Sequence, residues 1–211
     1  MNRTALPGAL AAALLAPLLA FAAAAAHANT ATVGQPAPAF SAVDTSGKTV
    51  SLADFKGKHV VLEWVNPGCP FVVKHYGSGN LPATQKEATA KGVVWLAVNS
   101  TAADHGDYKA PAALASWMKQ QGAAATHTLM DADGKVGKAF GARTTPHMYV
   151  IDPKGTLVYA GAIDNRPTAN PADIPGATNH VKVALAESLA GKPVTVAQTR
   201  PYGCSVKYSA M

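Results

Sequence analysis

The sequence predicts an α/β fold in which helices flank a central mixed sheet. Two runs that are apolar at nearly every position, residues 59–65 (HVVLEWV) and 92–100 (GVVWLAVNS), are typical of central strands buried on both faces. Two later strand-like runs, 146–152 and 156–164, are joined by the turn Pro-Lys-Gly, which indicates a hairpin. The chain has 211 residues and is 48% hydrophobic, enough for one domain with a substantial core.

The remaining elements follow from local signals along the chain. Short strands punctuated by Gly47 and Gly57 precede the first central strand, and a short strand is expected at 127–131. Helical patterns cover residues 70–76, 83–91, 110–122, 134–142 and 179–191. The order β-α-β-α-β-β-α, with parallel strands first and a hairpin last, is the thioredoxin arrangement. Without an internal repeat or a linker, we expect one domain over residues 29–211, ending in a cysteine-containing tail from about 193 to 211.

The N-terminus carries the pattern of an export signal. Residues 1–28 begin with one positive charge, Arg3, run apolar and Ala-rich, and close on Ala26-His27-Ala28, the small-x-small pattern that signal peptidase reads. We interpret them as a secretory signal peptide; the alternative is an uncleaved anchor, although Ala makes a weak span. The mature protein is therefore expected in the periplasm or outside the cell, with no stable membrane insertion after cleavage.

The charge of the chain indicates little about its partners. The formal net charge is +6, but the lysines are scattered and no basic run is interleaved with aromatic residues. We therefore expect no nucleic-acid partner.

The two cysteines carry more information. In an exported chain, Cys69 and Cys204 can pair, but two cysteines do not make a disulfide-dense scaffold. They form either one structural bridge or a redox couple.

Cys69 stands where a buried strand gives way to a helix. Pro70 suits the first helical position, because its missing N–H would have no intrahelical partner there. The sulfur then lies at the positive end of the helix dipole, which stabilises the thiolate that attacks disulfides and peroxides. The alternative is a buried, inert cysteine.

Several motifs together resemble one group of proteins. The stretches "GQPAPAF", "GKTVSLADFKGKHVVLEW", "NPGCPFV", "TTPHMYVIDPKGTLVYAGAID" and "GCSVKY" are similar to the redoxin group. This group includes the peroxiredoxins of the alkyl hydroperoxide reductase/thiol-specific antioxidant family and thioredoxin-like exported oxidoreductases. Apart from "GCSVKY", which resembles the C-terminal tail of a peroxiredoxin-like subgroup, the resemblance covers roughly residues 34–164. It implies a thioredoxin-like fold with thiol-based redox chemistry.

The sequence departs from the motifs of this group at two places. A Cys-x-x-Cys pair is absent, because Asn66 and Val72 stand three positions before and after Cys69, which excludes local dithiol chemistry. Asn66 also stands where peroxiredoxins have the hydroxyl that binds peroxide, and their arginine position falls at Pro146, with Arg143 nearby but out of register. These departures favour disulfide exchange over peroxide reduction.

The resemblance also implies a substrate-binding loop. "TTP" resembles the cis-proline turn of thioredoxins, in which the loop lies against the reactive cysteine and Thr145 offers its backbone to an extended substrate. Asn66, Thr145 and Pro146 are thus the candidate substrate-binding residues. The alternative for Pro146 is a trans proline that opens a strand.

Glu63 is the third candidate catalytic residue. A carboxylate within "VVLEWV" is costly to bury, and its place six positions before Cys69 matches the buried acid of thioredoxins. Such a group has a raised pKa and could relay a proton to or from a leaving thiol. The alternatives are an exposed strand end or a pairing lysine.

These observations lead to an exported thiol oxidoreductase with Cys69 as nucleophile and Cys204 as resolving thiol. Its substrate would be a protein or small-molecule disulfide or a peroxide. A partner protein would then reduce the disulfide between Cys69 and Cys204. One alternative is a thiol peroxidase of peroxiredoxin type. Another is a non-catalytic module with a structural Cys69–Cys204 disulfide. We expect no cofactor and no metal ion.

Overall fold

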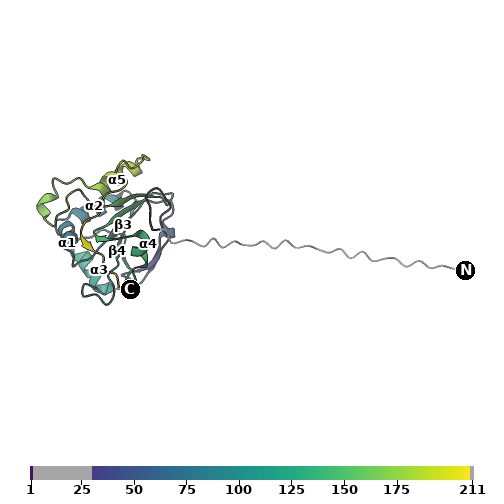
Figure 1. The fold of residues 1–211 in the computed structure, drawn as a ribbon, viewed down its shortest axis with the longest axis horizontal. Coiled ribbons are helices and arrows are strands. Elements are labelled where there is room, and N and C mark those ends of the chain that lie inside the picture. The colour runs from purple at the N-terminus through teal and green to yellow at the C-terminus, as the bar shows by residue number, and fades with distance from the viewer. Residues whose placement is uncertain (2–29, 210–211) are drawn as a thin grey trace.

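A computed structural model describes residue 1 and residues 30–209, so the predicted signal peptide lies outside the described residues apart from Met1 (Figure 1). The elements in chain order are β1 (Ser41–Asp44), β2 (Thr49–Ser51), the 3-10 helix η1 (Leu52–Phe55), β3 (Val60–Trp64), α1 (Pro70–Gly77), α2 (Asn80–Ala90), β4 (Val94–Asn99), α3 (Pro111–Gln120), β5 (His127–Met130), α4 (Lys135–Phe140), β6 (Thr144–Thr145), β7 (Met148–Ile151), β8 (Leu157–Gly161), the 3-10 helix η2 (Pro171–Asp173), α5 (His180–Leu189) and β9 (Cys204–Ser205).

Seven of the strands form one mixed sheet. Their order is β2-β1-β5-β4-β3-β7-β8. β4 pairs in parallel with β3 and with β5, whereas β7 pairs antiparallel with both β3 and β8. The predicted thioredoxin arrangement, with central parallel strands and a terminal hairpin, is confirmed.

Side chains alternate along β3 between two cores. Val60, Leu62 and Trp64 pack in a core that includes α4, and Val61 packs in a core that includes residues of α1, α2, α3 and α5. Figure 1 shows α1 and α2 on one side of β3 and β4 and α4 on the other. Because Glu63 lies two residues from Val61, its side chain enters the core beneath α1.

The tail returns along the sheet after α5. The amide N of Ala160 in β8 donates to the carbonyl oxygen of Ala197 at 3.1 Å, and the amide N of Thr199 donates back to the carbonyl oxygen of Ala160 at 3.1 Å. The tail then forms β9, which pairs antiparallel with β6 in a second, two-stranded sheet. No strand was expected in the tail, because two residues are too few to show a strand pattern.

None of the helices in the described part of the chain is both long and apolar enough to span a bilayer.

Candidate active site

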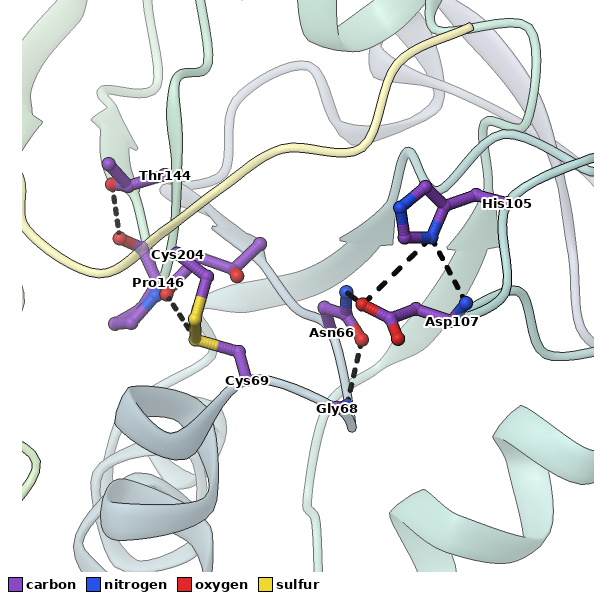
Figure 2. The surroundings of a disulfide bond; sticks show 9 residues. Asn66, Gly68, Cys69, His105, Asp107, Thr144, Pro146 and Cys204 are labelled. Carbon is purple, nitrogen blue, oxygen red and sulfur yellow. Dashed lines mark hydrogen bonds and ion pairs between the residues drawn. A yellow bond between two sulfur atoms is a disulfide. The ribbon is translucent and has the colours of Figure 1, made fainter.

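A disulfide joins Cys69 to Cys204 across 135 positions of sequence, with 5.9 Å between the Cα atoms. The fold thus brings together the two predicted redox residues. Figure 2 shows the bridge above the first turn of α1, with the 144–146 loop beside it.

The strand-to-helix junction places Cys69 as predicted. Cys69 is the residue that caps α1, and Pro70 occupies the first turn. The carbonyl oxygen of Cys69 accepts the amide N–H of Val73 at 2.9 Å, and the amide of Cys69 donates to the carbonyl oxygen of Asn66 at 3.0 Å. In the disulfide form its side chain accepts no capping hydrogen bond. A thiolate at this position would face the positive end of the helix.

The loop that precedes β7 lies against the bridge. The Thr145–Pro146 peptide bond is cis, as predicted. The carbonyl oxygen of Thr145 lies 3.0 Å from the Cys69 sulfur, and Thr145 pairs with Cys204 in the β6–β9 sheet. The backbone edge predicted to receive an extended substrate is therefore occupied by the protein's own tail.

Gly203 permits this close approach. Its φ is +135°, and a Cβ added there would lie 2.1 Å from the carbonyl oxygen of Thr145. Because only glycine fits this conformation and this space, the tail is shaped to lie against the 144–146 loop.

Asn66 shapes the turn that leads to Cys69. Its side-chain oxygen accepts the amide N–H of Gly68 at 2.8 Å, and its side-chain amide donates to Asp107 at 3.4 Å. Asp107 lies in the loop before α3, where its backbone amide donates to the ring of His105 at 3.0 Å (Figure 2). Asn66 is thus next to Cys69, but its polar groups are engaged within the protein.

Glu63 is fully buried and bound by three neutral donors. The Tyr76 hydroxyl donates to one carboxyl oxygen at 2.7 Å, and Gln85 and Trp95 donate to the other at 2.9 Å and 2.7 Å. The amide oxygen of Gln85 accepts the Ala124 N–H at 2.8 Å, which directs its NH₂ group at Glu63. Burial raises the pKa of Glu63, although these hydrogen bonds favour the carboxylate. Of the interpretations that the sequence left open, the structure shows the buried acid, and its partners are neutral groups rather than a lysine.

A buried polar cluster that the sequence did not predict lies under the tail. The ring of His75 in α1 lies 3.1 Å from the Tyr202 hydroxyl, which donates to Asp164 at 2.5 Å. The other ring nitrogen of His75 faces the Asn80 amide at 2.8 Å, and Lys74 lies 5.8 Å from the centre of the Tyr202 ring. Tyr202, two residues before Cys204, therefore fastens the tail to α1. An aromatic residue beside the second cysteine was the available signal for this anchor.

Burial lowers the pKa of His75 to about 4, and the nearby Asp164 only partly offsets it. The folded state favours the neutral ring. The stability that this pKa shift provides is therefore fully present above the ordinary pKa of 6.5 and is lost as the pH falls toward 4. We expect His75→Gln, which does not titrate, to reduce the loss of unfolding free energy between neutral pH and pH 5 by about 2 kcal/mol relative to wild type. Urea denaturation at a series of pH values measures this difference. Parallel pH profiles of the two proteins would contradict it.

The comparisons with known proteins agree with this architecture. The model of the AhpC/TSA family matches residues 33–160. A hypothetical protein from Sinorhizobium meliloti 1021 is similar in structure, with a TM-score of 0.73 and 28% identity over 87% of this chain and 98% of that chain. An uncharacterized conserved protein from Geobacillus kaustophilus has the same TM-score of 0.73 and 28% identity, over 87% of this chain and 95% of its own.

A protein described as a candidate thioredoxin, from Neisseria meningitidis, is similar over 73% of this chain and 92% of its own, with 28% identity and a TM-score of 0.52. No curated protein matches the sequence. The family match covers more than half of the chain and includes the strand-to-helix junction of Cys69 and the Thr145–Pro146 loop. The chain therefore belongs to the AhpC/TSA (redoxin) family, and its fold is that of the thioredoxin-like superfamily.

Proposed function

We propose that this protein is an exported thiol oxidoreductase that cycles between a Cys69/Cys204 dithiol and the Cys69–Cys204 disulfide. One observation carries the proposal: the tail holds Cys204 in a disulfide with Cys69, the N-cap residue of α1, against the Thr145–Pro146 loop. The signal-like residues 1–28 support a place in the periplasm or outside the cell, where such a disulfide can persist.

The cycle that we propose has four thiol–disulfide exchanges, two with the substrate and two with a dithiol partner. The Cys69 thiolate attacks one sulfur of a substrate disulfide, and the other substrate sulfur leaves as a thiolate. The Cys204 thiolate then attacks the Cys69 sulfur and releases the first substrate sulfur as a thiol. A dithiol partner protein reduces the resulting bridge and takes up the disulfide.

We propose that Glu63 donates and accepts protons in this cycle. It hydrogen-bonds to Tyr76 on the helix that Cys69 caps, and its raised pKa favours a carboxyl group that can hold a proton. Thr145 and Pro146 are proposed as the substrate-facing loop of the reduced protein, because in the disulfide form the tail occupies the Thr145 edge. The side-chain amide and oxygen of Asn66 hydrogen-bond within the protein. We therefore propose that Asn66 contacts substrate only once the Cys69 turn opens.

A structural role of the bridge is the second candidate function. Contacts other than the bridge also hold the tail: the Val206 amide donates to the Arg143 carbonyl at 3.0 Å, and the Tyr208 hydroxyl donates to the Ala142 carbonyl at 2.8 Å. The Tyr208 ring also lies directly against Gly137. A Cβ added to Gly137 would lie 2.3 Å from the Tyr208 hydroxyl. A tail fixed in this way is consistent with a permanent bridge in a non-catalytic module.

The reactivity of the reduced protein tests the proposal. We expect it to react with a small disulfide such as oxidised glutathione much faster, relative to a free thiol, than with hydrogen peroxide. A peroxidatic site needs donors that strengthen their hydrogen bonds as the O–O bond breaks, and the side-chain amide of Asn66 is directed at Asp107. Stopped-flow fluorescence with both oxidants gives the two rates.

Two variants serve as controls for this experiment. Cys204→Ser retains the Cys69 thiol and should stop at the mixed disulfide, whereas Cys69→Ser should lose the fast reaction. A peroxide rate constant orders of magnitude above that of a free thiol would replace the exchange proposal with the peroxidase alternative.

A further inference from the structure

A small pocket apart from the disulfide lies between α4, the loop before β7, β8 and the tail. Its volume is about 180 Å³, and the described residues that line it include neither cysteine and no carboxylate. Its polar lining comes from Arg143, His147, Gln198 and Thr199, and its apolar walls include Phe140 and Tyr149. The charge at this pocket is therefore positive and comes from one arginine.

His147 is the buried polar group of this pocket, since only 6% of the residue is exposed. Its Nδ1 accepts the backbone N–H of Arg143 at 3.3 Å and lies 3.1 Å from the hydroxyl of Tyr149. A neutral ring therefore carries its proton on Nε2. Nε2 has no hydrogen-bond partner among the described residues, and it is not one of their unpartnered atoms that are sealed from solvent, so it opens on the pocket.

Arg143 supplies the charge of the pocket. The residue is exposed, and none of the carboxylates in the described part of the chain forms a salt bridge with it. Burial is the main reason why the pKa of His147 falls to about 3, and the nearby charge of Arg143 lowers it further. The imidazole is therefore neutral at physiological pH, and the pocket combines one permanent cation with one neutral N–H donor.

The tail supplies a third donor. Gln198 pairs with Ala160 of β8 in a parallel bridge, and the Thr199 amide donates to the Ala160 carbonyl oxygen at 3.1 Å, which fixes this part of the tail beside the pocket. The Thr199 hydroxyl is engaged, because it accepts the Ala162 amide N–H at 2.9 Å and lies 2.7 Å from the Tyr159 hydroxyl. The Gln198 side chain is exposed and forms no hydrogen bond with another described residue, so its amide is available to a ligand.

We propose that this pocket binds a small monocarboxylate, which pairs with Arg143 and accepts hydrogen bonds from Nε2 of His147 and the side-chain amide of Gln198. A guanidinium presents paired N–H groups that match the two oxygens of a carboxylate. One guanidinium balances one negative charge, whereas a phosphate dianion would keep a second charge without a partner. The site does not depend on the proposed redox cycle, because neither cysteine takes part in it.

The size of the pocket limits the ligand. Pockets for drug-sized molecules measure about 300–1,000 Å³, so a volume of about 180 Å³ admits an acid of only a few carbon atoms. Its short apolar part would lie against the walls formed by Phe140 and Tyr149. Because the ligand would contact both the loop before β7 and the tail, its binding should favour the docked tail.

Butyrate is a suitable test compound, and butyramide is its neutral analogue of nearly the same shape. The oxidised, isotope-labelled protein of residues 29–211 is titrated with each compound at neutral pH, and the NMR shifts of backbone amides and imidazole rings report where it binds. We expect saturable shifts at Ala160, Gln198 and the His147 ring. The affinity for butyrate should exceed that for butyramide or inorganic phosphate by at least about tenfold.

Two exposed arginines give matched variants. Arg143→Gln removes the charge of the pocket and should lower the affinity for butyrate by at least about tenfold. Arg200→Gln removes the same charge from a tail residue outside the lining of this pocket, and should leave the affinity within about twofold of wild type. Gln198→Ala should also weaken binding, and it leaves the buried His147 unchanged.

The inference would be overturned by the absence of saturable shifts at the pocket, or by equal affinities for butyrate and butyramide. Tighter binding of phosphate than of butyrate would exclude the monocarboxylate as the ligand class. An Arg143→Gln protein that binds butyrate as tightly as wild type would place the binding elsewhere.

Discussion

Glu63→Ala is expected to lower the free energy of unfolding of the oxidised protein by about 3–5 kcal/mol. The substitution leaves three buried donors, on Tyr76, Gln85 and Trp95, without their common acceptor. Each unsatisfied donor costs about 1–3 kcal/mol, partly recovered because Gln85 also donates to the Tyr76 oxygen at 3.0 Å. Urea denaturation measures the loss, and a loss below about 1 kcal/mol would contradict this account of the buried acid.

Glu63→Gln is the matched variant. Its amide oxygen can accept from Gln85 and Trp95 while its NH₂ group faces the Tyr76 oxygen, so most of the stability should remain. If Glu63 handles protons, this variant should nevertheless slow thiol exchange and change its pH profile. An unchanged profile would restrict Glu63 to its structural role.

Reduction of the Cys69–Cys204 bridge is the second change with a large expected effect. Closing a loop of 135 positions stabilises a fold by about 4–5 kcal/mol in the chain-entropy model. In a redox-active protein, the helix N-terminus stabilises the Cys69 thiolate of the reduced state by up to about 2 kcal/mol and offsets part of this gain. We therefore expect the oxidised protein to be more stable than the reduced protein by only about 2–3 kcal/mol.

Denaturation of the protein with and without reductant measures this difference. Cys69→Ser lacks both the bridge and the thiolate at the helix N-terminus, so it should be less stable than the reduced wild-type protein. A full difference of 4–5 kcal/mol between oxidised and reduced wild type, with Cys69→Ser as stable as the reduced form, would favour the structural bridge.

Much of the fold could be predicted from local patterns. The continuous apolar runs of β3 and β4 are buried on both faces, as their composition indicated, and the turn after β7 forms the predicted hairpin. Cys69 could be placed because a strand, a proline and a helix follow one another within a few residues. Burial of Glu63 was only one interpretation of a single acid in an apolar strand, beside an exposed strand end or a pairing lysine, and the structure decides between them.

The tail could not be predicted in the same way. β9 has two residues, and its partner β6 lies far away in the sequence, so neither shows a periodic pattern. The anchor of Tyr202 on Asp164 and His75 also joins three distant segments. Only the tertiary structure reveals that the tail occupies the Thr145 edge, which the sequence had led us to expect for a substrate.

The reduction potential of the Cys69–Cys204 bridge tests the central claim most directly. It is measured by equilibrating a protein of residues 29–211 with defined ratios of a dithiol and its disulfide, and then counting alkylated cysteines by mass spectrometry. Oxidoreductases that exchange disulfides have potentials between about −120 and −270 mV, whereas structural bridges of secreted proteins lie below about −300 mV. A value within the first range is the result that we predict for a redox cycle through Cys69 and Cys204. A value below about −300 mV would contradict that cycle and identify the bridge as a permanent structural disulfide that holds the tail.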